Sequence, residues 1–344
     1  MSTSFRGNRR GSSFPSRKRN GVFRGGSQSS PKKSWADMTE EENQKDGYSQ
    51  QEAKEHRERR QDEKKLLTQE LYLPSRGEEF RKFLHHILLN IMRIPEEKVN
   101  LLLQDHFALF VQAFTHRSVD PSQNYEILEL LGDAVLTFCI LDYLVKRFPQ
   151  LEDPSGKHVS TLSRLKINFV SKKIYGECAR NLNFLPFIAS DQLTRKEDDV
   201  SLLEDVFEAF ARAVYKGLSQ IEQIRTDMMI SAGPILRMLT YIFDQKQISL
   251  EYEDLYDARS RLKELSEKLS QQLAPIDTTR KYDRNGRIVF TSVIKETTGT
   301  IWGTGQGLTK NQSVQEACEN AIANLIKTNT GKESYDQLRK RQNS

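Results

Sequence analysis

The sequence predicts a mostly helical domain followed by a small α+β domain, with a basic, low-complexity arm in front of both. Three observations predict this order. Apolar residues recur at helical spacing from about residue 79 to residue 247. Beyond residue 257, a helical stretch is followed by segments of alternating apolar and polar residues, typical of strands, and then by a last helical stretch. Residues 1–33 hold nine Lys or Arg and no Asp or Glu.

The N-terminal arm is assigned to residues 1–74. Its first part is rich in Ser, Gly and Arg and has too few apolar residues to order itself by burial. Two interpretations stand equal: a flexible arm that contacts nucleic acid, or a solubilising or targeting tail. Residues 48–71 interleave Glu with Lys and Arg, which indicates a solvated helix or a disordered charged linker.

The helical domain is assigned to residues 75–247. Loop chemistry separates most of its predicted helices, for example at Asp120-Pro121, Pro149 and Gly233-Pro234. The spacing of apolar residues predicts helices over 79–92, 95–104, 106–113, 125–147, 159–181, 202–217, 218–230 and 235–244.

Two acidic clusters lie inside these helices. Glu126, Glu129 and Asp133 fall at i, i+3 and i+7, and Asp205 and Glu208 at i and i+3, so each cluster occupies one face of its helix. Like charges stacked in this way destabilise a helix unless a cation lies between them. Carboxylates that converge on Mg²⁺ or Mn²⁺ would remove that penalty, whereas for either cluster alone an acidic solvent face is the commoner explanation.

The motifs around these clusters resemble those of the ribonuclease III family. The segment from Asn124 to Leu136 is similar to the family signature, Thr115-His-Arg-Ser118 to a segment upstream of it, and Leu203–Phe210 to the second acidic helix. The resemblance covers about three quarters of the chain, from near Gly77 to near Lys327. The long region before the helical domain is similar to that of fungal members, a group that includes budding-yeast Dicer.

The resemblance implies a helical nuclease domain whose Glu129, Asp133, Asp205 and Glu208 bind Mg²⁺, with Mn²⁺ as a substitute, and carry catalysis. Glu126 is expected to support the site. The implied enzyme is a homodimer that hydrolyses double-stranded RNA, leaving 5′-phosphate and 3′-hydroxyl ends with short staggered overhangs. The alternative is a non-catalytic protein that binds or sequesters duplex RNA, or a structural subunit of an RNA–protein particle.

Residues 257–328 have the order α-β-β-β-α and resemble a double-stranded-RNA-binding domain, and residues 329–344 are expected to be a polar tail. The resemblance implies RNA contacts by Glu264 and by Lys310 at the start of the last helix. A usual Gly-Pro-x-His element is missing, so weaker duplex binding is expected, with Arg284 and Arg287 compensating. In the nuclease domain, Arg212 replaces a usual Gly, with an unknown effect on activity.

Composition restricts the class of protein further. The net charge is +5 and the pI about 8.9, which suits a polyanionic partner. Residues 1–33 alone carry +9, so the rest of the chain carries about −4. The three cysteines, Cys139, Cys178 and Cys318, show no zinc-binding spacing and indicate free thiols. Neither a signal peptide nor a membrane span is expected, so the predicted location is intracellular, cytoplasmic or nuclear.

Overall fold

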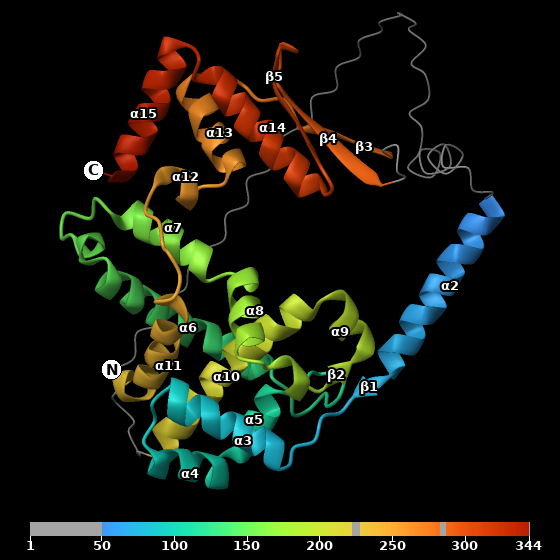
Figure 1. Cartoon of the computed structure of the whole chain (residues 1–344), viewed down its shortest axis with the longest axis vertical. Helices are drawn as coiled ribbons and strands as arrows, with labels where there is room; N and C mark the ends of the chain where they lie inside the picture. Colours follow the sequence, from blue (N-terminus) through green and yellow to red (C-terminus); the bar gives the residue numbers. More distant parts are fainter. Residues whose placement is uncertain (1–49, 222–227, 283–286, 344) are drawn as a thin grey trace, which may run out of the picture. The chain divides into compact units, whose positions relative to one another are not determined.

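The computed structural model describes residues 50–221, 228–282 and 287–343. The chain divides into two units, Met1–Gln61 and Asp62–Ser344. Most described secondary structure is helical (Figure 1). Up to residue 255 the elements are α2 (Gln50–Gln69), β1 (Leu71–Tyr72), α3 (Glu78–His86), the π-helix η1 (Ile87–Ile91), α4 (Glu96–Asp105), α5 (Phe107–Ala113), α6 (Glu126–Arg147), η2 (Pro149–Glu152), α7 (Val159–Phe169), α8 (Lys172–Asn181), η3 (Leu185–Phe187), β2 (Ser190–Asp191), α9 (Gln192–Glu197), α10 (Asp199–Ile221), α11 (Met228–Phe243) and α12 (Tyr252–Leu255).

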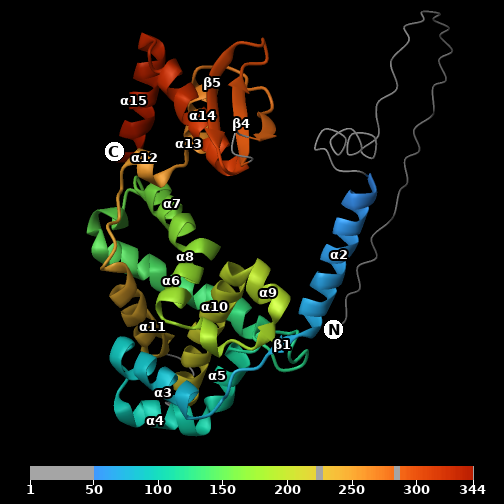
Figure 2. The same cartoon turned by 45° about the vertical axis from the view of Figure 1, so that its right-hand side comes forward.

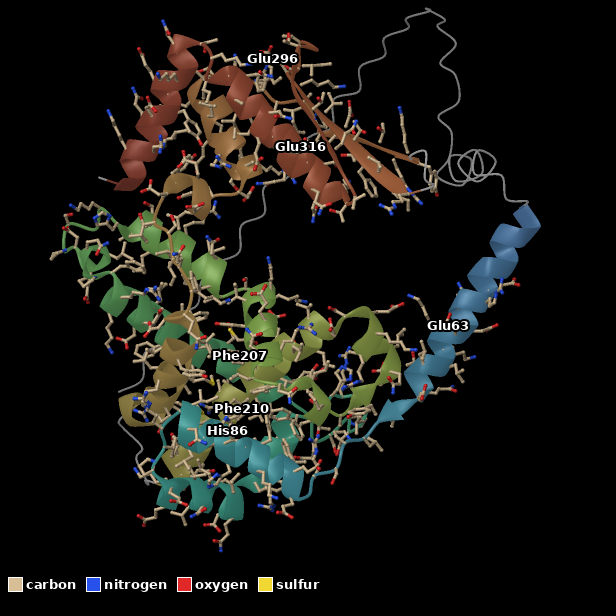
Figure 3. All side chains as sticks on the ribbon, viewed as in Figure 1. Glu63, His86, Phe207, Phe210, Glu296 and Glu316 are labelled. Carbon is tan, nitrogen blue, oxygen red and sulfur yellow. The ribbon has the colours of Figure 1, made fainter. Side chains whose placement is uncertain are left out.

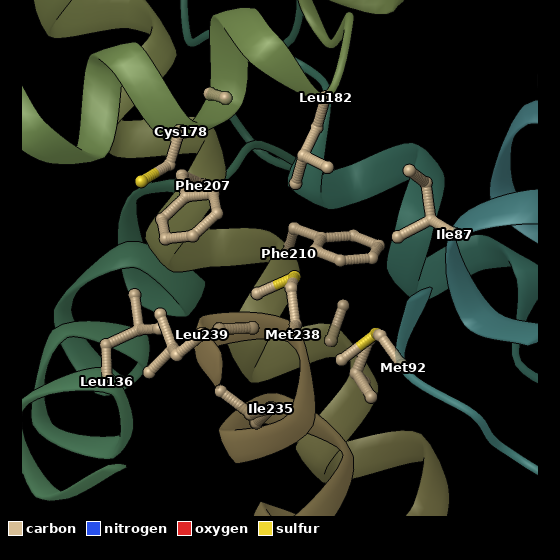
Figure 4. Close-up of a cluster of buried hydrophobic side chains, with 14 of the residues drawn as sticks. Ile87, Met92, Leu136, Cys178, Leu182, Phe207, Phe210, Ile235, Met238 and Leu239 are labelled. Atoms are coloured by element: carbon tan, nitrogen blue, oxygen red, sulfur yellow. The ribbon is translucent and has the colours of Figure 1, made fainter. Parts of the chain in front are cut away.

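Helix α10 forms the centre of the helical domain, with α6, α8, α11 and α5 packed around it (Figure 2). Its apolar residues are buried on nearly all sides, as expected for a core helix. Figure 4 shows Phe207 and Phe210 of α10 facing Met238 and Leu239 of α11, and Figure 3 places the same two rings inside the domain. Phe210 also meets Phe184 edge to face at 5.2 Å between ring centroids. This core fixes the position of α10 and therefore of its acidic residues.

The C-terminal domain is a three-stranded antiparallel sheet packed against helices. Its elements are α13 (Ala258–Lys268), β3 (Asp277–Tyr282), β4 (Ile288–Lys295), β5 (Ile301–Gly307), α14 (Lys310–Leu325) and α15 (Asn329–Asn343). The strand order is β3-β4-β5. Strand β5 lies directly against α14, because a Cβ on Gly305 would be only 2.3 Å from the backbone nitrogen of Ala317. Thr309 and Gln312 begin α14 with a capping box.

The predicted fold class is confirmed: a helical domain is followed by a small α+β domain with the order α-β-β-β-α. Two separate hydrophobic cores support the division, one from Phe80 to Leu255 and one from Tyr252 to Leu338. The segment around residues 252–255 contributes to both cores, so the boundary between 247 and 257 stays a proposal. Among the described residues, no helix is long and apolar enough to span a bilayer.

Several elements differ from the expectations. The stretch 159–181 is two helices, since Val170 and Ser171 interrupt it, and α11 runs through Pro234 without a break. Part of the charged run 194–199 lies in α9, which Asp191 caps by accepting a hydrogen bond from the Thr194 amide. The expected polar tail is helix α15, whose Tyr335 and Leu338 are buried in the second core. Of the two interpretations of residues 48–71, α2 favours the helix.

Candidate functional site

The two acidic helices meet at Gly132. A Cβ on Gly132 would lie 1.9 Å from the carbonyl oxygen of Glu208, far inside any permitted contact. Only a glycine allows α6 to approach the backbone of α10 this closely. Glu129 and Asp133 flank Gly132 in α6, and Glu208 is itself the contact residue in α10. The absent side chain at Gly132 therefore brings the two acidic clusters together.

The four predicted catalytic carboxylates influence one another electrostatically. Glu208 is only 8% exposed; its burial, followed by the negative charges of Asp133, Glu204, Glu129 and Asp205, raises its pKa to about 9. Burial, then Asp205, Glu126 and Glu204, raises the pKa of Glu129 to about 7. Burial is the largest cause of both shifts, and the positive charge of Lys172 opposes the rise in the pKa of Glu129.

Asp205 and its neighbour Glu204 each have a specific partner. Burial raises the pKa of Asp205, and a hydrogen bond from the Tyr125 hydroxyl to its Oδ2, at 2.9 Å, opposes that rise. Lys172 Nζ lies 3.7 Å from Glu204 Oε2 and also hydrogen-bonds to Ser201 Oγ. Sequence reasoning gave no role to Tyr125 or Lys172. The position of Tyr125, directly before the acidic helix, is the one local signal that could have indicated it.

Glu126 lies at the edge of this cluster. Its side chain is exposed, and Oε1 accepts a hydrogen bond from Arg117 Nη1 at 3.1 Å. Both partners are solvated, so this ion pair contributes little stability. The structure gives Glu126 a place beside the four carboxylates rather than among them, and its supporting role stays a prediction.

The donor chemistry of the cluster fits a hard divalent cation. All four side chains offer oxygen, and the negative charges of four other carboxylates act on buried Glu208, a repulsion that a cation would offset. In the described part of the chain, however, no three His, Cys, Asp or Glu side chains are grouped as a ready set of metal ligands. The backbones of α6 and α10 are thus in contact, while the present side-chain conformers do not form a coordination sphere.

The predicted RNA-contacting residues lie in the C-terminal domain, away from the acidic cluster in sequence and in a different core. Glu264 is half-buried and accepts a hydrogen bond from the Tyr252 hydroxyl at 2.8 Å, which ties α13 to α12. Lys310 is exposed at the first turn of α14. Arg287 is exposed directly before β4, and Arg284 falls outside the described residues. Their RNA contacts stay predictions.

Arg212 lies one turn beyond Glu208 on α10. Its side chain is half-buried, with its guanidinium carbon 5.1 Å from the centroid of the Tyr215 ring. Its Nε atom is buried and makes no hydrogen bond within the described residues. The Arg212 side chain thus contacts Tyr215 of its own helix, and the structure assigns it no role.

Exposed apolar side chains follow one face of α6 next to the acidic cluster. Ile127, Leu130 and Leu131 are 55%, 69% and 41% exposed, and Phe138 is 36% exposed. They recur at i, i+3, i+4 and i+11, so they form one stripe, here called the α6 stripe. Contiguous exposed apolar surface of this kind marks interaction sites in soluble proteins.

Comparisons with known proteins found a matching family model and several similar proteins. A family model described as Ribonuclease III domain matches residues 126–217, which include all four carboxylates. A putative ribonuclease 3 from Invertebrate iridescent virus 6 is 31% identical over 285 residues, covering 78% of this chain and 95% of that protein. A putative ribonuclease 3 from Frog virus 3 (isolate Goorha) is 36% identical over 215 residues, covering 62% of this chain and 55% of that protein. Among solved structures, the ribonuclease III nuclease domain from Campylobacter jejuni aligns with 42% of this chain and 99% of that chain at 26% identity and a TM-score of 0.33.

Proposed function

The chain belongs to the ribonuclease III family and is a ribonuclease of that type, and from this premise we propose that it is a divalent-metal-dependent endonuclease for double-stranded RNA. The single observation that carries the proposal is the contact of Gly132 with the Glu208 backbone, which brings two carboxylate-bearing helices together. Glu129, Asp133, Asp205 and Glu208 would hold the cation. The proposed products carry 5′-phosphate and 3′-hydroxyl ends with short staggered overhangs.

The protein's contribution to the reaction is mainly positioning and charge. A bound divalent cation supplies water activation and stabilises the charge that develops on the leaving oxygen. The four carboxylates would hold that cation, and the α6–α10 backbone contact at Gly132 positions the two helices that carry them. Burial of Glu208 excludes water from its side of the site, which strengthens every charge interaction there.

Duplex RNA is the proposed substrate because the C-terminal domain has the α-β-β-β-α order of a duplex-binding domain. A-form RNA is recognised chiefly through its shape, phosphates and 2′-hydroxyls. Lys310 is exposed in the first turn of α14, and we propose that it meets a phosphate together with the helix N-terminus. Arg287, exposed directly before β4, and Arg284, which lies outside the described residues, are proposed to add charge.

The active form is proposed to be a homodimer that buries the α6 stripe. The stripe is apolar, continuous along one helix and adjacent to the acidic cluster, so a two-fold contact there would bring two sites near each other. Two sites related by such an axis could cut the two strands of a duplex, which accounts for the proposed staggered ends.

Substitution of Glu208 tests the proposed function. Purified wild-type protein and Glu208→Gln are incubated with long duplex RNA in Mg²⁺, in Mn²⁺, in Ca²⁺ and with chelator, and product lengths and duplex affinity are measured. We expect cleavage by the wild type only with Mg²⁺ or Mn²⁺, and none by Glu208→Gln, whose duplex affinity should stay within about twofold because the substitution removes a buried proposed metal ligand. Cleavage by the variant would refute the assignment. Duplex binding by the wild type without cleavage in any divalent metal would favour the non-catalytic alternative.

A further inference from the structure

The hydroxyl of Tyr125 holds one oxygen of Asp205 across the two acidic helices. Tyr125 immediately precedes α6 and is only 4% exposed. Its hydroxyl donates to Oδ2 of Asp205 at 2.9 Å, although the residues are 80 positions apart. A hydrogen bond to one oxygen fixes the carboxylate's rotation and leaves Oδ1 as the atom available to a cation.

The backbone of Tyr125 is anchored on both sides. Its amide donates to the carbonyl of Thr115 at 3.1 Å, and its carbonyl accepts from the amide of Glu129 at 2.8 Å. The second bond belongs to the first turn of α6, so the tyrosine and the proposed ligand Glu129 move as one unit. A movement of Tyr125 would therefore shift both Glu129 and Asp205.

The ring of Tyr125 packs against a second buried network. Its centroid is 5.6 Å from that of His116. His116 Nδ1 is 2.7 Å from Ser118 Oγ and 3.7 Å from Asp191 Oδ2, and Ser118 Oγ accepts from the Asp191 amide at 3.0 Å. Asp191 lies in β2, which pairs with β1 through Leu71. The tyrosine ring is thus supported by a network that extends to the strand preceding the domain.

We infer that Tyr125 is a positioning residue for the proposed metal site: its hydroxyl orients Asp205, and the His116–Ser118–Asp191 network keeps the ring in place. This inference rests on the proposed function. Groups that orient a metal ligand typically change metal affinity or activity by about 10- to 100-fold when they are removed. Loss of the Tyr125 hydroxyl should therefore weaken cation binding while leaving RNA binding intact.

Tyr143 offers a matched control within the same region. It lies in α6, is also buried at 4% exposure, and its hydroxyl donates to an aspartate, Asp244 Oδ1, at 3.0 Å. Its hydroxyl also accepts a hydrogen bond from Arg147 Nη1, which donates to the carbonyl of Phe243 as well. Tyr143 therefore helps to hold the end of α11 against α6. Both Tyr125→Phe and Tyr143→Phe remove one hydroxyl that bonds to an aspartate, but only the first hydroxyl touches the acidic cluster.

The experiment measures Mn²⁺ binding directly, by the electron paramagnetic resonance signal of free Mn²⁺, in wild type, Tyr125→Phe, Tyr143→Phe and Glu208→Gln. Cleavage rates are then measured at several duplex RNA concentrations, to obtain kcat and the KM for RNA. The measurement is repeated over a range of Mg²⁺ concentrations. We expect Tyr125→Phe to bind Mn²⁺ about 10- to 100-fold more weakly, with an RNA KM within twofold of wild type and with activity partly restored by excess Mg²⁺. Tyr143→Phe should keep wild-type Mn²⁺ affinity and kcat while its melting temperature falls.

Wild-type Mn²⁺ affinity in folded Tyr125→Phe would overturn the inference, as would an equal loss in Tyr143→Phe. If Tyr125→Phe does not fold, His116→Asn provides the test, since it removes the ring that supports Tyr125 and should lower Mn²⁺ affinity in the same direction. The proposed function and the positioning role of Tyr125 are tested by different results. Metal-independent cleavage, or cleavage by Glu208→Gln, contradicts the proposed function. An inactive Glu208→Gln beside an unaffected Tyr125→Phe contradicts the positioning role alone.

Discussion

Replacement of Gly132 by alanine should separate the two acidic helices and abolish most cleavage. The added Cβ would lie 1.9 Å from the Glu208 carbonyl oxygen, whereas ordinary contact begins at 3.4 Å, so the backbones must part by about 1.5 Å. Overpacking of this kind costs about 1–3 kcal/mol, against which alanine recovers about 1 kcal/mol of helix propensity. A displacement of about 1 Å at a catalytic site can reduce the rate about 100-fold.

Gly233→Ala is the matched control for this change. Gly233 is also a helical glycine, in α11, but a Cβ there meets only Arg237 Nη1, at 3.6 Å, an ordinary contact. We expect Gly233→Ala to keep wild-type kcat and to be neutral or more stable by up to about 1 kcal/mol. Gly132→Ala should lower the melting temperature and reduce kcat at least about 100-fold in an assay run well below that temperature. Wild-type kcat in Gly132→Ala would refute the claim that this contact builds the site.

Three further predictions concern pH, the arm and the α6 stripe. The pKa of Glu208 is raised from 4.5 to about 9 and that of Glu129 from 4.5 to about 7, so the metal-free folded state binds protons more tightly than the unfolded state. Its melting temperature should therefore fall as pH rises from about 5 to about 9, and saturating Mg²⁺ should flatten this fall; a flat metal-free profile would contradict the burial argument. Deletion of residues 1–49, which leaves α2 and the β1–β2 pairing intact, should make the logarithm of RNA affinity less steep against the logarithm of salt concentration, and an unchanged slope would mean that the arm does not touch RNA. Leu130→Glu should yield a monomer in analytical ultracentrifugation, whereas Leu308→Glu, at a residue 64% exposed in the C-terminal domain, should not; a dimeric Leu130→Glu would exclude the stripe as the interface.

The sequence predicted the parts of the fold that depend on local periodicity. The helices that carry Glu129, Asp133, Asp205 and Glu208 were expected on the correct segments, and so were the three strands of the C-terminal domain. These elements follow from apolar spacing at 3.6 or 2 residues, which one sequence reveals. The capping residues Asp191 and Thr309 are also local signals, but they were not among the predictions.

Features that depend on packing between distant segments were not predictable in this way. In the sequence, nothing near Gly132 distinguishes it from another glycine inside a helix. Its role depends on the contact with the backbone of α10. The Tyr125–Asp205 hydrogen bond spans 80 residues, and the β1–β2 pair joins Leu71 to Asp191. Glu264 accepts a hydrogen bond from the Tyr252 hydroxyl that the sequence did not indicate, while its RNA contact stays a prediction. In each case the partner is set by tertiary structure and leaves no periodic signal.

The most direct test of the account is the location of a bound cation. Crystals of the wild-type protein would be soaked in Mn²⁺ and its anomalous difference density measured. The account predicts a peak between α6 and α10, at coordination distance from carboxylates of both helices, and its loss in Glu208→Gln. Absence of any peak there at saturating Mn²⁺, or a peak bound by one helix alone, would contradict the claim that the Gly132 contact creates a shared metal site.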